Sequence, residues 1–319
     1  MRVRLKPLKK QFFLFSVWVI GLTGLMHCVD AQIAFTSGDH WTSDIYMITI
    51  DGKDIKQLTN NKLDNGHPAW SPDGTQIAFV SEGEEVGLNN YDIYVMRVNE
   101  RRPINLTKHP TRDGSPDWSP NGQQIVFSSL RDGNPEVYVM NADGTNPTRL
   151  TDHPRADIYP AWSPDGTQIA FESTRIFGSD IFIMNTDGTN VIRVTDDPQW
   201  DTRPAWSPDG TQITFARWRN RIFDIYIIGV DGEGETNLTN SEFQDNYPTW
   251  SPDGQWIAYS SESNHRFGIY VMNADGRKKS IALIDDLEFA IDPDWSPSLL
   301  AVSSKGKMST LWGILKREK

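Results

Sequence analysis

Residues Trp162–Phe171 read Trp-Ser-Pro-Asp-Gly-Thr-Gln-Ile-Ala-Phe, and the same phrase returns along the chain. Near-complete copies begin at four other tryptophans and a shortened copy begins at a fifth: Trp70, Trp118, Trp206, Trp250 and Trp295. Successive copies start 48, 44, 44, 44 and 45 residues apart. Repetition at about 40–45 residues, with four short strands in each repeat, is typical of a β-propeller.

Each copy predicts two short strands joined by a tight turn. Trp-Ser ends strand a, Pro-Asp-Gly forms the turn, and the residues that follow form strand b. Proline presets φ at the first central turn position and glycine takes the positive φ that other residues resist. Strand b is apolar on both faces, as in Ile169-Ala170-Phe171. This pattern indicates a sheet packed between two neighbours, and the recurring tryptophan fits a packing role there.

The rest of each unit predicts strand c, an Asn-x-Asp-Gly turn in several units, and a short strand d ending in Leu-Thr or Val-Thr. The first unit begins at strand b (Gln32–Phe35), and the Trp-Ser-Pro that it lacks stands at Trp295–Pro297. We therefore predict an all-β protein, a six-bladed β-propeller of four-stranded antiparallel blades over residues 32–297. Strands from both chain ends would share the closing blade. Seven blades remain the alternative, because Leu299–Ser304 also resembles strand b.

The first 31 residues differ from the repeats. A basic start precedes Phe12–Met26, an uncharged and mostly apolar run, and small residues stand at Val29 and Ala31. This pattern predicts a signal peptide cleaved near Ala31 and a periplasmic or secreted protein without a membrane span. An uncleaved anchor and lipidation at Cys28 are the alternatives. Residues 298–319 would form a C-terminal tail.

The loops between blades and the loops between strands b and c share one face of the predicted ring, which varies in length and chemistry. The opposite face carries the short, repeated turns. Because function usually resides on variable loops over a rigid scaffold, we place the working face on the variable side. An acidic residue stands five positions before most of the repeated tryptophans. Together these residues would form an acidic ring at the channel mouth, or each would hydrogen-bond nearby backbone and brace its own linker. These acids are Asp113, Asp157, Asp201 and Asp245.

A second set of residues precedes each linker proline, and its chemistry differs from blade to blade. Residues that only build the scaffold tend to repeat from blade to blade. A position that varies in this way indicates either a specific binding pocket or ordinary variation in a solvated loop. The set consists of His67, Ser115, Tyr159, Arg203, Tyr247 and Asp292. The b–c loops add Arg175, Trp218 and Arg219 as candidate contacts. An exposed tryptophan beside arginines is the composition of interface anchors, although Trp218 could also cover a blade edge.

The sequence contains no nucleophile elbow, no His-Glu-x-x-His motif and no phosphate-binding glycine loop. We therefore expect a non-enzymatic, monomeric module without a cofactor or metal, which binds an envelope protein or a small polar ligand. The net charge of −11 argues against nucleic acid as a partner. The alternative is a lyase or hydrolase with a polar site in the channel that uses His67, Tyr159, Arg203 and Tyr247. A weak metal candidate comprises His40, His67 and His265.

The repeated Trp-Ser-Pro-Asp-Gly, Ile-Ala-Phe, Ile-Tyr-Val-Met-Asn and Leu-Thr segments resemble the propeller repeat of the TolB family over residues 32–297. The resemblance implies a six-bladed propeller in the periplasm that makes protein–protein contacts within the Tol–Pal envelope system. TolB proteins carry an α/β domain before the propeller, whereas here the expected signal peptide leads directly into strand b. The repeat is also similar to the propellers that gate prolyl-oligopeptidase-type peptidases.

Overall fold

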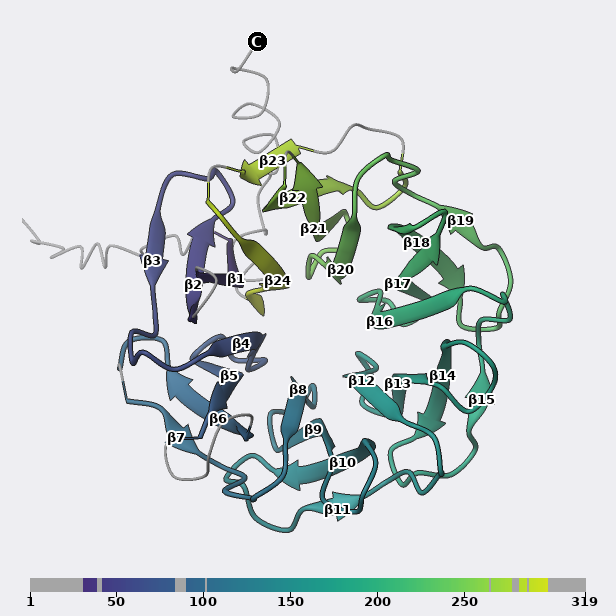
Figure 1. Cartoon of the computed structure of the whole chain (residues 1–319), viewed down its shortest axis with the longest axis horizontal. Helices are drawn as coiled ribbons and strands as arrows, with labels where there is room; N and C mark the ends of the chain where they lie inside the picture. The colour runs from purple at the N-terminus through teal and green to yellow at the C-terminus, as the bar shows by residue number, and fades with distance from the viewer. Residues whose placement is uncertain are drawn as a thin grey trace, which may run out of the picture.

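The computed structural model is a ring of six β-sheets around a central axis (Figure 1). It describes residues 31–38, 42–83, 90–100, 102–263, 265–276, 281–285 and 287–297. Every sheet in this part of the chain has four antiparallel strands, and the innermost strand of each faces the axis (Figure 1). The predicted six-bladed propeller is therefore confirmed. The segment that suggested a seventh blade lies outside the described residues.

Blade 1 joins the two ends of the propeller. It consists of β24 (Ala290–Trp295), β1 (Gln32–Gly38), β2 (Ser43–Thr49) and β3 (Ile55–Gln57), in that order from the axis outward. Ile33 lies opposite Trp295 in the register, and the Ser296 N–H donates to the Gln32 carbonyl at 2.8 Å. The predicted closing blade, with strand a from the C-terminal side, is thus present.

The other five blades each use four consecutive strands. Blade 2 contains β4 (Asn65–Trp70), β5 (Gln76–Glu82), β6 (Tyr91–Arg97) and β7 (Ile104–Asn105). Blade 3 contains β8 (Asp113–Trp118), β9 (Gln124–Ser129), β10 (Glu136–Asn141) and β11 (Thr148–Arg149). Blade 4 contains β12 (Asp157–Trp162), β13 (Gln168–Ser173), β14 (Asp180–Asn185) and β15 (Ile192–Arg193). Blade 5 contains β16 (Trp200–Trp206), β17 (Gln212–Arg219), β18 (Ile222–Gly229) and β19 (Thr236–Asn237). Blade 6 contains β20 (Asp245–Trp250), β21 (Trp256–Ser263), β22 (Arg266–Asn273) and β23 (Ile281–Ile284).

The apolar core lies between the blades. Each of six buried clusters draws its side chains from two adjacent blades, so that one cluster fills every blade–blade interface. Between blades 3 and 4, for example, Val126 and Val137 pack with Trp162 and Phe171. This arrangement explains why strand b is apolar on both faces. Because every cluster among the described residues draws on two blades, each blade depends on its two neighbours for its core.

The Pro-Asp-Gly turns hold strands a and b together on one face. In blade 2 the Asp73 carboxylate accepts hydrogen bonds from the Ser71 hydroxyl at 2.6 Å and the Thr75 N–H at 2.9 Å. Gly74 has φ of +68°, a conformation that the other residue types seldom adopt. These bonds satisfy the polar groups of the turn within the blade itself.

Among the described residues no helix is long and apolar enough to cross a membrane.

Candidate functional site

The residue before each linker proline has a left-handed backbone conformation in all six blades. The φ angles lie between 50° and 56°, although none of these residues is glycine. The innermost strand shifts its register at this point, as between Gly66 and Ala69 in blade 2. A bulge of this kind redirects the side chain of the extra residue. Six chemically different side chains are thereby presented at one repeated backbone position.

These six side chains line a single cavity inside the ring, with a volume of about 300 Å³. The cavity follows the innermost strands as far as Pro164 and Pro208, where the turns between strands a and b begin. The structure therefore brings together the full set that the sequence singled out, namely His67, Ser115, Tyr159, Arg203, Tyr247 and Asp292. Whether they bind a ligand stays a prediction.

Three aromatic rings from alternate blades meet near the axis. The His67 ring centroid lies 6.1 Å from that of Tyr159 and 6.4 Å from that of Tyr247. His67 Nδ1 also lies 3.4 Å from a carboxylate oxygen of the buried Asp292. Burial lowers the pKa of His67 more than the Asp292 charge raises it, so the imidazole is neutral at pH 7.

Arg203 lies between the two tyrosines of this layer. Its guanidinium carbon is 4.6 Å from the Tyr159 ring centroid and 3.8 Å from the Tyr247 ring centroid. Nη2 donates to both phenolic oxygens, at 3.2 and 2.8 Å respectively. Burial raises the pKa of both phenols, so they keep their protons at neutral pH. Arg203 Nε is buried and has no hydrogen-bond partner among the described residues.

A second layer of the cavity contains two acids that sequence reasoning missed. Asp117 and Asp294 stand immediately before Trp118 and Trp295, and both line the cavity. Burial raises the pKa of Asp117 to about 6 and that of Asp294 to about 7. The sequence could have revealed them, because the residue before the repeated tryptophan is Ala in three blades and Thr in one but Asp in these two.

The model of the TolB beta propeller domain matches residues 29–146 and 89–299, which together span the whole described ring. The chain belongs to the TolB β-propeller family. Over 59 residues it is 39% identical to the protein TolB homolog of Chlorobaculum tepidum, a match that spans 18% of this chain and 14% of that protein. A similar match, 37% over 60 residues, links it to the Tol-Pal system protein TolB of Desulfosudis oleivorans, again over 14% of that protein.

Solved TolB structures share the fold. TolB from Acinetobacter baumannii superposes with a TM-score of 0.73 and 22% identity, over 83% of this chain and 66% of that chain. The putative TolB from Agrobacterium tumefaciens gives a TM-score of 0.69 and 22% identity, over 84% of this chain and 94% of that chain. At this level of identity the likeness concerns the fold alone.

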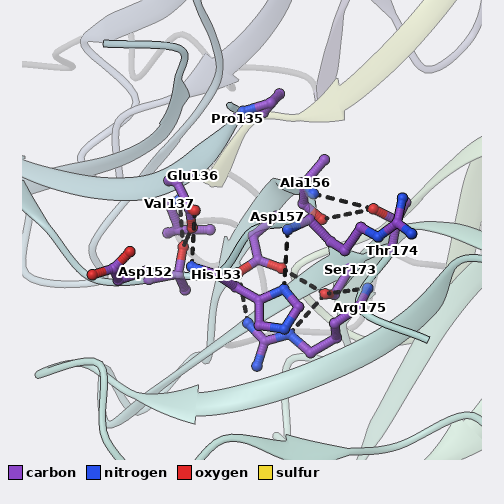
Figure 2. Close-up of polar contacts among 12 residues, drawn as sticks. Pro135, Glu136, Val137, Asp152, His153, Ala156, Asp157, Ser173, Thr174 and Arg175 are labelled. Carbon is purple, nitrogen blue, oxygen red and sulfur yellow. Dashed lines mark hydrogen bonds and ion pairs between the residues drawn. The ribbon is translucent and has the colours of Figure 1, made fainter. Parts of the chain in front are cut away.

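In this TolB-type propeller the four predicted acids lie inside the blades rather than at the channel mouth. Asp157 accepts from the Ser173 hydroxyl at 2.5 Å and from Arg175 Nη2 at 2.6 Å (Figure 2). Asp113 pairs with Arg131 at 3.2 Å, and Asp245 accepts from the Ser261 hydroxyl at 2.5 Å. All four are buried, which matches the bracing role considered for them. Arg175, one of the candidate contacts, is engaged in the same brace.

Asp201 has the most enclosed partner of the four. Arg217 occupies the position opposite it, where blades 3, 4 and 6 carry a serine. Arg217 Nε and Nη2 donate to the two carboxylate oxygens at 2.6 and 2.8 Å, and both side chains are fully buried. This pair joins strands β16 and β17 within blade 5.

Trp218 and Arg219 lie on the loop face, at the tip of the β17–β18 hairpin. Trp218 is half-buried against Phe223, with ring centroids 4.9 Å apart, and it pairs across the sheet with Trp200. Arg219 is half-exposed, with Nη2 3.8 Å from Asp197. Trp218 therefore covers its hairpin and is also open to solvent. The more exposed aromatic in this pair is Trp200, which the sequence interpretation did not select.

The histidines form no metal site in the part of the chain that the structure describes. His265 is exposed at a hairpin tip, where Nδ1 lies 3.7 Å from Glu262, whereas His67 faces the channel. His40 lies outside the described residues. No group of three potential metal ligands occurs within the described ranges.

Proposed function

We propose that this protein is an exported, non-enzymatic module of the cell envelope that binds another envelope protein on the loop face of blades 4 to 6. The observation that carries the proposal is a strip of three exposed and two half-buried aromatic residues, here called the rim strip. It consists of Phe177, Trp200, Trp218, Phe223 and Phe243. Aromatic side chains and arginine are enriched where protein interfaces bury their anchors.

The members of the rim strip are linked by contacts across two blade junctions. Gly178 lies next to the Trp200 ring, and the Asp201 N–H donates to the Ser179 carbonyl at 2.7 Å. At the other end the Phe223 N–H donates to Gln244 Oε1 at 3.1 Å, which brings Phe243 to the hairpin. Phe177 is 94% exposed, Trp200 57% and Phe243 50%. Apolar side chains exposed to this extent, and gathered together, mark interaction surfaces.

The family suggests the class of partner. One relative is named as a protein of the Tol-Pal system, and an envelope protein is the partner that this name suggests for the present chain. The location would be the periplasm, after removal of residues 1–31. Ala31 is buried and its carbonyl accepts from the Ile50 N–H, so cleavage after Ala31 would have to precede folding. N-terminal sequencing of the exported protein should give Gln32 as the first residue; a chain that starts at Met1 would contradict export by cleavage.

Affinity purification from envelope extract tests the partner surface. The test variant combines Phe177→Ser with Trp200→Ser, and the control is Ile104→Ser, an equally exposed apolar residue on the outer edge of blade 2. We expect wild type and the control to retain the same envelope protein and the double variant to lose it. Both changes concern exposed side chains, so melting temperatures should stay equal. Retention of the partner by the double variant would remove the rim strip from the proposal.

The second candidate function is a hydrolase or lyase in the central channel. It is favoured by the convergence of His67, Asp292 and Arg203 on one cavity and by the pKa of Asp294, raised by burial to about 7. A carboxyl group poised near neutral pH suits general acid–base work. The test is turnover of a panel of lyase and hydrolase substrates by wild type and His67→Gln. Activity that disappears in the variant would support the enzyme, and no activity in either protein would count against it.

A further inference from the structure

The central cavity is electrically polarised across the ring axis. Its lining carries Arg203 and two tyrosine hydroxyls on the side of blade 5, and on the sides of blades 1 and 3 it carries Asp294 and Asp117, which have no paired cation among the described residues. Blades 1, 3 and 5 alternate around the ring (Figure 1). A molecule in the cavity therefore faces both kinds of group, and this site is separate from the rim strip.

The donor side is built around Arg203. The Tyr159 and Tyr247 hydroxyls accept from Arg203 Nη2, so each phenol must direct its own proton elsewhere. The hydroxyls of Tyr159 and Tyr247 occur only as acceptors among the bonds of the described residues, so both phenolic protons are free for a ligand. Arg203 Nε also has no partner there, but it is fully buried and does not face the cavity. Buried donors are normally matched by an acceptor. Two phenolic donors beside one guanidinium suit a carboxylate, which accepts several charge-assisted hydrogen bonds at once.

The acidic side consists of Asp117 and Asp294. Each accepts a hydrogen bond at 2.7 Å from a backbone N–H of another blade, that of Trp162 for Asp117 and that of Trp70 for Asp294. No cationic side chain pairs with either carboxylate within the described ranges, and the two acids raise one another's cost of ionisation. A carboxylate removed from water without a counter-charge is unfavourable. An ammonium group in the cavity would supply that charge.

The balance of charge selects the class of ligand. A simple anion would bind Arg203 but be repelled by Asp117, Asp292 and Asp294, and a simple amine would be attracted to the acids but repelled by Arg203. A molecule with both groups satisfies both sides. The volume of about 300 Å³ is at the lower end for small-molecule sites, which limits the ligand to roughly the size of an amino acid.

We propose that the central channel binds a small zwitterion of the amino-acid class. Its carboxylate lies against Arg203, Tyr159 and Tyr247, and its ammonium group lies against Asp117 and Asp294. Tyrosine and histidine rings and the linker prolines enclose the rest of the molecule.

Isothermal titration calorimetry of the purified protein tests this proposal. The probes are glycine, γ-aminobutyrate and 6-aminohexanoate, which increase the distance between the two charges, with acetate and ethylammonium as single-charge controls. We expect at least one amino acid to bind at least tenfold more tightly than either control. The proposal is overturned if none of the amino acids binds, or if acetate or ethylammonium binds as tightly as the best of them.

Two conservative variants locate the binding site. Tyr247→Phe keeps the ring and removes one donor, and Asp294→Asn keeps the shape and removes one charge. Each should weaken the best amino acid about tenfold or more, since a hydrogen bond to a charged group contributes about 1.5–3 kcal/mol. Ile104→Ser, on the outer edge of blade 2, is the control and should bind as wild type does. Equal affinity in wild type, Tyr247→Phe and Asp294→Asn, with unchanged melting temperatures, would place the binding elsewhere and refute the proposal.

Discussion

At the scale of single residues, the backbone conformation before each linker proline decides what the channel contains. A left-handed conformation costs a non-glycine residue about 1 kcal/mol, and the following proline restricts it further. Glycine would remove that cost, yet all six positions carry larger side chains. The retained strain favours a role for the side chains themselves. Sequence reasoning identified the position from its variability but not the conformation, because a bulge depends on the register of the neighbouring strand.

The buried pair of Asp201 and Arg217 gives the first prediction. Asp201→Ala should lower the free energy of unfolding by about 3 kcal/mol, because a fully buried guanidinium loses its bidentate carboxylate and keeps only Glu235, 2.6 Å from Nη1, and the more distant Asp197. Urea denaturation measures the change. Asp197→Ala is the control, since Asp197 lies 3.5 Å from the same Arg217 but is partly exposed, and it should cost less than about 1 kcal/mol. Equal losses in the two variants would show that burial does not set the strength of these pairs.

The second prediction concerns Asp294 and pH. Burial raises the pKa of the folded-state carboxyl to about 7, above that of the unfolded chain, so the folded protein binds this proton more tightly between about pH 4 and 7. The stability from that proton is fully present below about pH 4 and is lost as pH rises through 7. Relative to Asp294→Asn, wild type should therefore lose on the order of 3 kcal/mol between pH 4.5 and 8.

Thermal and urea unfolding of both proteins across this range measures that difference. Comparing the two proteins at each pH cancels the distant carboxyl groups to first order, whereas Asp117, which is coupled to Asp294, contributes to the difference. A difference between wild type and Asp294→Asn that stays constant with pH would contradict the raised pKa.

At the scale of strands and turns, the sequence predicted most of what the structure contains. The Trp-Ser-Pro-Asp-Gly phrase located the inner hairpin of five blades, because proline, aspartate and glycine each have a defined role in the turn. The repeat also located the closing strand β24. Exposure on the loop face could not be predicted in the same way. Phe177 and Trp200 are brought together by a contact between a b–c loop and a linker, which no repeated motif encodes.

Ring closure gives the third prediction. Trp295 is as buried as Trp162, although it reaches its blade from the other end of the chain. Trp295→Ala should therefore destabilise the protein as much as Trp162→Ala does, by about 3–5 kcal/mol, since each leaves a cavity of similar size. Chemical denaturation of both variants provides the comparison. A near-neutral Trp295→Ala beside a strongly destabilising Trp162→Ala would show that β24 does not complete blade 1 in solution.

At the scale of the whole molecule, the two faces of the ring and its central channel carry different kinds of residue. The repeated turns form one face, the rim strip gathers aromatic residues on the other, and the channel holds the charged residues in between. The polarity of the channel could not be read from the sequence. It depends on which blades stand opposite one another and on Asp117 and Asp294. The residue type at their repeat position changes less from blade to blade than it does before the linker prolines, so the sequence did not single it out.

Site-specific photo-cross-linking in the native envelope tests most directly the claim that the loop face is the working face. A photoreactive amino acid would replace Phe177 on the rim strip or, as the matched control, Thr145 in an exposed turn of the opposite face. We predict one discrete protein adduct from position 177, which excess unlabelled wild type displaces and the Phe177→Ser/Trp200→Ser variant does not. No such adduct should form from position 145. Adducts from position 145 alone, or equal displacement by both competitors, would contradict the account.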